Sequence, residues 1–292
     1  MDYRDFGTTG LRVSALGLGA GQIGDENLPE QTVERLLHTA LDMGINLIDT
    51  ARGYGLSEER IGKHLAKRRG EYVLSTKVGY GIPNTQDWTY DCVVHGVEAA
   101  LQRLNTDYID IVHLHSCPQS ILEQGDVILA LERAAQDGKV RVIGYAGDNE
   151  PLAYAVRSGR FGSMITSLNI CDQRVIDYPL SEAKQRGMGV IAKRPIANAP
   201  WRFTERPAGH YGEVYWERWQ TMNLNLGMDW QAVALRFAAF TYGVDSCIVG
   251  TTSLEHLRAN VAILEDGPLD TAIVDTLRAA FRQHDNQWLG QV

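Results

Sequence analysis

Eight short apolar runs recur along this sequence at intervals of about 30 residues, and this repeat constrains the fold more than any other feature. Helical patterns lie between the runs, the clearest over 33–41, which ends at Gly44. The predicted strands cover 13–18, 45–48, 72–76, 108–114, 140–145, 164–168, 190–192 and 246–249. One strand, one helix and the next parallel strand take about 30 residues, so the pattern predicts an α/β fold, a (β/α)8 TIM barrel.

The stretch RDFGTTGLRVS, with Gly7 and Gly10 around two threonines, predicts an N-terminal β-hairpin. We expect this hairpin to close the bottom of the barrel. No linker and no internal repeat of sequence divides the chain, so we expect one barrel domain over 1–292.

A doubly wound sheet would show the same alternation of strands and helices. Gly19, Gly21 and Gly24 have the GxGxxG spacing that binds dinucleotides in such folds. However, the acidic residue that should then hold a ribose would have to be Asp49, and that role would conflict with its place among the ionisable residues at the strand ends. The barrel is therefore the preferred interpretation.

Composition excludes several classes of protein. The charge is −8, from 28 Lys and Arg against 36 Asp and Glu, and the basic residues form no stripe, which argues against nucleic acid as a partner. The four cysteines form no CxxC pair, so neither a zinc knuckle nor a dithiol site is indicated. The sequence shows neither a signal peptide nor an apolar run of about 18 residues, and we expect a cytoplasmic protein without a membrane partner.

Four ionisable residues lie at or just after the ends of three consecutive predicted strands: Asp49, Tyr54, Lys77 and His115. In a barrel these positions meet at the carboxyl-terminal mouth, where chemistry takes place. Each residue alone has an ordinary structural explanation, such as a turn cap, a loop aromatic or a core histidine. Together they suit proton donation to a carbonyl oxygen.

The chemistry of this group follows from charge. A nearby ammonium stabilises a phenolate and lowers the pKa of a tyrosine, and a carboxylate keeps that ammonium charged. A histidine can donate a hydrogen bond to the same carbonyl oxygen. No side chain here supplies a hydride, so a bound cofactor must do so.

Long stretches of the chain resemble the aldo-keto reductase superfamily. They include DTARGYGLSEERIG at 49–62, STK at 75–77, DYIDIVHLH at 107–115, VIGYAGDN at 142–149, GMGVIAKRP at 187–195 and IVGTTSLEHLRAN at 248–260. The resemblance implies a barrel that binds a nicotinamide dinucleotide and passes a hydride to an aldehyde or ketone. It assigns the catalytic tetrad to Asp49, Tyr54, Lys77 and His115, with Tyr54 as general acid.

The resemblance also identifies where the cofactor should bind. Relatives usually hold the nicotinamide amide with a Ser-Asn pair and a glutamine, and stack its ring on an aromatic residue. This chain instead has Ala146, Gly147, Ile165 and Lys193 at those positions. NADP is the expected cofactor, with NAD as the alternative. The implied cofactor contacts are Gly19, Asp49, Ala146, Asn169, Lys193, Arg194, Thr251, Thr252, Arg258 and Asn260.

The substrate is expected to be a small carbonyl compound that contacts Tyr54 and His115. Two long loops, 79–91 and 195–226, offer aromatic residues for a pocket wall or an interface, including Tyr80, Trp88, Trp201 and a further group at Tyr211, Tyr215, Trp216 and Trp219. Trp88 and Trp201 are the predicted substrate contacts.

Two other functions stay open from the sequence. The altered amide positions suit a module that binds nicotinamide and senses its redox state for a partner, with little turnover. His113 and His115 share one face of a strand and suit a metal-dependent hydrolase, although a catalytic zinc needs about three protein ligands and the sequence shows no third one. A hydrogen-bonded core histidine is the preferred interpretation of His113, and no metal is expected.

Overall fold

A computed structural model describes residues 1–291 of the protein. Eight parallel strands close into a barrel in chain order, and the last strand, β10, pairs with the first, β3. The barrel strands are β3 (Leu16–Gly19), β4 (Leu47–Asp49), β5 (Val73–Val78), β6 (Ile109–His115), β7 (Val140–Ala146), β8 (Ser163–Ser167), β9 (Gly189–Lys193) and β10 (Ser246–Val249). The predicted (β/α)8 barrel is confirmed, and the doubly wound alternative is wrong because an open sheet has two edge strands, whereas here β10 pairs with β3 and closes the sheet.

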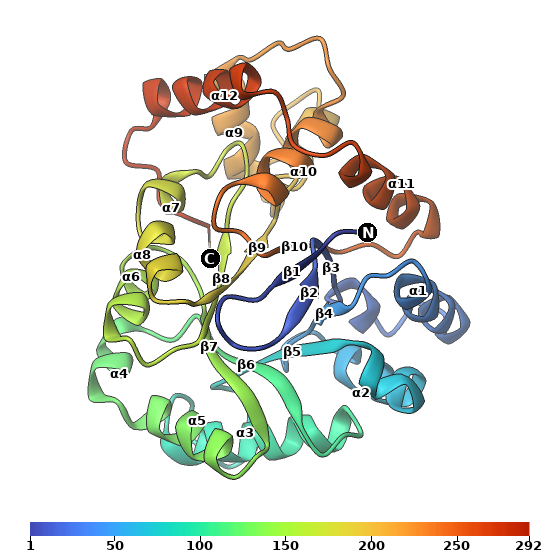
Figure 1. Ribbon diagram of the computed structural model, residues 1–292, viewed down its shortest axis with the longest axis vertical. Coiled ribbons are helices and arrows are strands. Elements are labelled where there is room, and N and C mark those ends of the chain that lie inside the picture. Colours follow the sequence, from blue (N-terminus) through green and yellow to red (C-terminus); the bar gives the residue numbers. More distant parts are fainter. Residues whose placement is uncertain (292) are drawn as a thin grey trace.

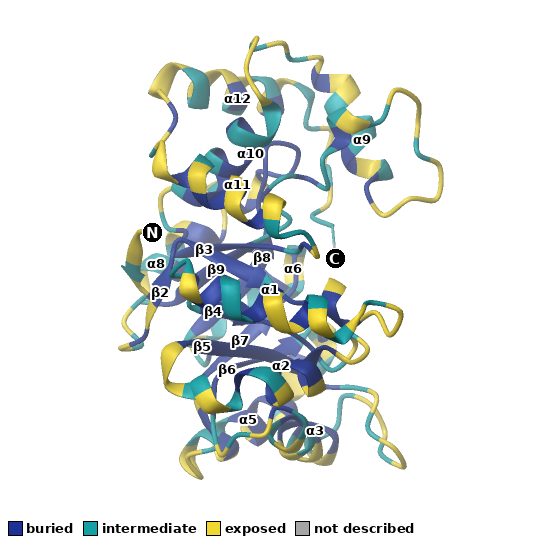
Figure 2. Ribbon diagram, turned by 90° about the vertical axis from the view of Figure 1, so that its right-hand side faces the viewer, coloured by how far each residue is buried: buried dark blue, intermediate teal, exposed yellow. Residues whose placement is uncertain are grey.

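Helices surround the barrel (Figure 1). They are α1 (Glu30–Asp42), α2 (Ser57–Leu65), α3 (Tyr90–Arg103), α4 (Gln119–Gln124), α5 (Asp126–Gln136), α6 (Asn149–Ser158), α7 (Arg174–Asp177), α8 (Leu180–Gln185), α9 (Glu213–Met222), α10 (Trp230–Phe240), α11 (Leu254–Glu265) and α12 (Thr271–His284), with short 3-10 helices η1 (Gln22–Gly24), η2 (Ala66–Glu71) and η3 (Pro200–Arg202). Figure 2 shows buried residues along the strands and exposed residues on the outer faces of the helices. Among residues 1–291, no helix combines the length and apolar character needed to cross a membrane.

The strands are apolar because both of their faces are covered. In β5 every residue is buried, as is usual for parallel strands between a barrel interior and a ring of helices. The first predicted run, 13–18, is in fact two strands. Ser14 donates a hydrogen bond to the carbonyl of Leu16 and accepts one from the amide of Asn46, so the chain turns there before β3 begins.

The predicted hairpin is present. Strand β1 (Tyr3–Asp5) pairs antiparallel with β2 (Arg12–Ser14), and the hairpin crosses the end of the barrel (Figure 1). Phe6 is fully buried in the interior cluster that includes Leu47 and Val73, the first residues of β4 and β5. Its ring therefore plugs the amino-terminal end of the barrel and leaves the carboxyl-terminal end for a site.

Candidate active site

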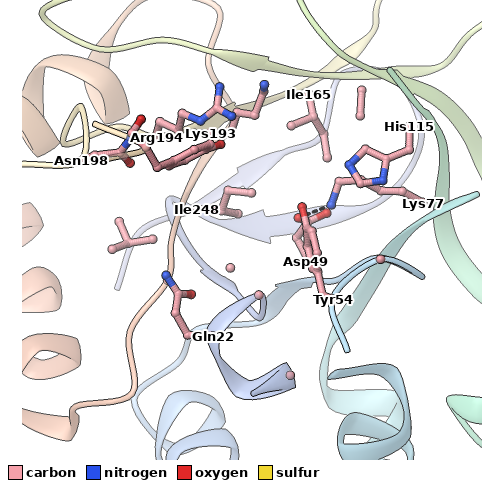
Figure 3. Close-up of a pocket in the computed structure, with 18 of the residues that line it drawn as sticks. Gln22, Asp49, Tyr54, Lys77, His115, Ile165, Lys193, Arg194, Asn198 and Ile248 are labelled. Atoms are coloured by element: carbon pink, nitrogen blue, oxygen red, sulfur yellow. Dashed lines mark hydrogen bonds and ion pairs between the residues drawn. The ribbon is translucent and has the colours of Figure 1, made fainter. Parts of the chain in front are cut away.

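A cavity of about 790 Å³ opens at the carboxyl-terminal ends of the strands. This volume is within the usual range of small-molecule sites. Figure 3 shows Asp49, Tyr54, Lys77 and His115 on one side of the cavity and Lys193 and Arg194 on another. Eight of the residues predicted from the sequence line it: Gly19, Asp49, Tyr54, Lys77, His115, Ala146, Lys193 and Arg194.

Lys77 and Asp49 form a buried ion pair on the wall of the cavity. The Lys77 Nζ atom lies 2.6 Å from Oδ2 of Asp49 and donates to the carbonyl of Thr50 at 2.8 Å. The hydroxyl of Ser75 donates to the other carboxylate oxygen of Asp49 at 2.7 Å. Burial opposes the charge on Lys77, but Asp49 and Tyr54 outweigh it and raise the pKa of Lys77 above its ordinary value. The ammonium is therefore charged at neutral pH.

Tyr54 reaches this ion pair from the loop after β4. The Nζ atom of Lys77 lies 4.9 Å from the centre of the Tyr54 ring. The loop is held by a close approach to η1, because a Cβ on Gly24 would lie only 1.7 Å from the carbonyl oxygen of Tyr54. The amide of Leu56 also donates to the carbonyl of Gly24 at 3.0 Å. Only glycine leaves room for this contact, so Gly24 sets the position of Tyr54.

His115 ends β6 beside Tyr54. The two rings lie edge to face with their centroids 5.9 Å apart. Burial first, and then the charges of Lys77 and Lys193, lower the pKa of His115 to about 3. The imidazole is therefore neutral near pH 7, with one N–H and one acceptor nitrogen.

His113 lies deeper in the barrel. It is fully buried, and its Nε2 atom is 2.9 Å from the hydroxyl oxygen of Ser163, as the interpretation of a hydrogen-bonded core histidine requires. Burial, followed by the charge of Lys77, holds its pKa well below the ordinary value. Within residues 1–291, no group of three His, Cys, Asp or Glu side chains is arranged to hold a metal ion. Among the described residues, His113 and His115 therefore have no third ligand of the kind that a metal-dependent hydrolase needs.

Lys193, at the position where the resemblance leads us to expect an aromatic residue, forms a second, partly buried ion pair. Its Nζ atom lies 2.7 Å from Oδ2 of Asp148 and 3.1 Å from the carbonyl oxygen of Gln291. Burial outweighs the effect of Asp148 and lowers the pKa of Lys193. Ala146 and Ile165 line the cavity nearby, so this wall combines apolar groups with a cation.

Arg194 adds a second cation to the same wall. One guanidinium nitrogen, Nη1, donates to the hydroxyl of Ser167 at 3.0 Å and to the carbonyl of Gln291. The guanidinium lies 4.7 Å from the centre of the Tyr211 ring, which also lines the cavity. This side of the cavity is therefore suited to an anionic group.

Five predicted cofactor contacts lie outside the cavity lining. Asn169 is buried and supports the wall, since its amide donates to the carbonyl of Arg194 at 3.1 Å. Asn260 is also buried and accepts from Gln231 at 2.8 Å. The other three lie at or near the start of α11, where Thr251 accepts from the amide of Ser253, and Thr252 and Arg258 are exposed.

The two tryptophans predicted to contact substrate also lie outside the cavity lining. Trp88 packs edge-on against Tyr80 with ring centroids 5.8 Å apart, and Trp201 packs against Trp219 at the same distance. Tyr211, from the same loop as Trp201, lines the cavity instead. Loops have no periodicity that shows which aromatic side chain turns inward, so the sequence could not predict that Tyr211, and not Trp88 or Trp201, lines the cavity.

Sequence reasoning missed several lining residues. Gln22 follows the first barrel strand, and Ile248, Val249 and Gly250 lie at the end of the last one. The rule that barrel sites gather at strand ends would have found these four. Asn198 lies in an irregular loop and gave no such signal.

The fold and this cavity define a (β/α)8 barrel with a small-molecule site at its carboxyl-terminal mouth, and comparison with known proteins identifies the family. The model described as "Aldo/keto reductase family" matches residues 15–282, and the chain belongs to this family. It is 29% identical to L-galactose dehydrogenase of Arabidopsis thaliana over 284 residues, which cover 91% of this chain and 89% of that protein. The resemblance seen in the sequence is confirmed.

Solved structures agree with this assignment. The aldo-keto reductase from Bacillus halodurans in its holo form superposes with a TM-score of 0.83 at 26% identity, covering 96% of each chain. A putative aldo-keto reductase from Pseudomonas aeruginosa gives a TM-score of 0.72 at 30% identity, covering 90% of this chain and 94% of that one. Family membership implies an NAD(P)H-dependent oxidoreductase that acts on a small molecule.

Proposed function

We propose that this protein reduces an aldehyde or ketone, with Tyr54 as the general acid. The observation that carries the proposal is the position of Lys77, held between the Asp49 carboxylate and the Tyr54 ring at the wall of the cavity. A bound reduced nicotinamide supplies the hydride to the carbonyl carbon. Tyr54 supplies the proton to the carbonyl oxygen, and in the reverse direction it accepts that proton.

Each member of the group has a separate task. The ammonium of Lys77 stabilises the phenolate that Tyr54 becomes after it gives up its proton. Asp49 keeps Lys77 charged in a buried position. His115 is neutral, and its free N–H orients the carbonyl oxygen and stabilises the negative charge that develops there.

The residues around the cavity fit a nicotinamide dinucleotide. Gly19 and Ala146 leave room for a flat ring, and the wall of Lys193 and Arg194 suits the phosphates or the amide. Asn169 would act by holding Arg194 in place. We propose that the amide groups at the start of α11 bind the adenosine-side phosphate, with Thr251, Thr252 and Arg258, and that the buried Asn260 acts indirectly by holding Gln231 against this helix. NADP is the preferred cofactor on family grounds.

The substrate is proposed to be a small carbonyl compound that approaches Tyr54 and His115 from the open cavity. Tyr211 replaces Trp201 as the proposed aromatic contact, because it lines the cavity and Trp201 does not.

Substitution of Tyr54 tests the proposal. In Tyr54→Phe we expect kcat for small aldehydes to fall by a factor on the order of 10² to 10⁴, the usual contribution of general acid catalysis, with the Kd for NADPH unchanged. The matched control is Tyr242→Phe, since Tyr242 is 88% exposed. Turnover is followed at the absorbance band of the reduced nicotinamide, and titrations with NADPH and NADH compare the cofactors.

Two results would overturn the proposal. Near-normal turnover of Tyr54→Phe would remove the role of its hydroxyl. Tight binding of NADPH without turnover over a broad panel of carbonyl compounds would instead favour a redox-sensing module.

A further inference from the structure

Tyr80 contacts the imidazole of His115 at its Nδ1 atom. It follows β5, and its hydroxyl oxygen lies 2.8 Å from the Nδ1 atom of His115. The two rings are stacked, with centroids 5.5 Å apart and planes inclined by 30°. This contact uses one ring nitrogen of His115 and leaves the other, Nε2, for a ligand.

The direction of this hydrogen bond decides where the single proton of the imidazole lies. Either the tyrosine hydroxyl donates to Nδ1, with the proton on Nε2, or Nδ1–H donates to the tyrosine oxygen. In the second case the hydroxyl proton would need an acceptor of its own. Within residues 1–291, the only hydrogen-bond partner of the Tyr80 hydroxyl is His115. Only the first arrangement leaves an N–H on Nε2, which the role proposed for His115 requires.

We propose that Tyr80 is a positioning residue that donates its hydrogen bond to Nδ1 of His115 and so keeps the proton on Nε2. This inference rests on the proposed function, in which His115 donates a hydrogen bond to the carbonyl oxygen. A donor at Nδ1 also withdraws electron density from the ring and makes Nε2–H a stronger donor. Tyr80 thus acts on the reaction through His115, without contact with the substrate.

Trp88 supports Tyr80 from the outside. The amide of Trp88 donates to the carbonyl of Gly79 at 2.8 Å, and its indole lies so close over Gly79 that a Cβ there would be 2.1 Å from the ring. Gly79 also has a φ of +132°, in the region that favours glycine. The indole packs edge-on against Tyr80, which gives Trp88 a supporting role in place of the predicted substrate contact.

The tautomer can be measured directly in the wild-type protein. With ¹⁵N-labelled histidine at pH 7, we expect an unprotonated Nδ1 and a protonated Nε2 for His115, assigned by the signals that disappear in His115→Asn. In Tyr80→Phe, which retains the ring, we expect the Nδ1 signal to move towards the average of the two tautomers. We also expect kcat/KM to fall about tenfold, or about 1.4 kcal/mol, with the Kd for NADPH within about twofold.

Tyr72→Phe is the matched control, since the hydroxyl of Tyr72, the residue before β5, is buried and has no hydrogen-bond partner within the described residues. It should leave both the ¹⁵N signals of His115 and kcat/KM unchanged. A proton on Nδ1 in the wild type, or unchanged signals and kcat/KM in Tyr80→Phe, would overturn the inference. Normal turnover of His115→Asn would instead overturn the proposed role of His115, and the ¹⁵N signals would still decide the tautomer.

Discussion

Replacement of Lys77 by methionine tests the buried ion pair most directly. The substitution keeps most of the side-chain volume and removes the charge that lies 2.6 Å from Asp49. Unit charges at that distance attract by about 6 kcal/mol when the effective dielectric constant is about 20. Much of this energy offsets the cost of burying the two charges. The loss of one partner leaves the other unpaired, and we expect the free energy of unfolding to fall by about 3 to 5 kcal/mol.

The double variant Asp49→Asn/Lys77→Met separates this effect from packing. It leaves no unpaired charge, so it should be more stable than Lys77→Met although both should be inactive. The control is Lys139→Met, because the pair of Lys139 with Glu98 is 3.0 Å long but exposed and should contribute less than about 1 kcal/mol.

The measurement is urea unfolding at pH 7, followed by circular dichroism. Equal losses of stability in Lys77→Met and Lys139→Met would refute the reasoning. A double variant whose loss of stability equals the sum of the losses in Asp49→Asn and Lys77→Met would also refute it, because the two charges would then not be coupled.

Three further predictions follow from particular contacts. In Gly24→Ala, the new Cβ would lie 1.7 Å from the carbonyl oxygen of Tyr54, so we expect kcat to fall more than tenfold and the free energy of unfolding to fall by about 1 to 3 kcal/mol. The control Gly70→Ala, whose Cβ meets open space, should change neither quantity. Equal behaviour of the two variants would contradict the close approach at Gly24. Tyr72→Phe removes a buried hydroxyl that lacks a partner in residues 1–291, so its urea midpoint should equal or exceed that of the wild type, and a clear decrease would show that the hydroxyl is bonded. The pKa of His115 is about 3 in the folded protein, below its unfolded value of about 6.5, so the unfolded chain binds the extra proton and stability is lost as the pH falls from about 6.5 towards 3. From pH 7 to pH 5, the urea midpoint of the wild type should therefore fall further than that of His115→Gln. Equal decreases in the two proteins would count against the low pKa of His115.

Local patterns were sufficient to predict the barrel and the region of its site. Strands buried on both faces leave apolar runs, and the turns between them leave glycines, so the eight strands were visible without a structure. The carboxyl ends of parallel strands meet at one mouth, so Asp49, Lys77 and His115 could be expected on one cavity from their places in the chain. Tyr54 could be expected at the same mouth because it lies only five residues after Asp49, in the loop that follows that strand.

The directions of loop side chains were not predictable in this way. Tyr80 reaches His115 across 35 positions of sequence, and Asp148, in the loop after β7, reaches Lys193 across 45. The carbonyl of Gln291 completes the wall from a segment far along the chain. Loops lack the fixed period that tells which way a strand residue points, so their side chains turn inward or outward according to the packing of distant elements. That packing turns Tyr211 into the cavity and leaves Trp88 and Trp201 outside it, and it exists only once the barrel has closed.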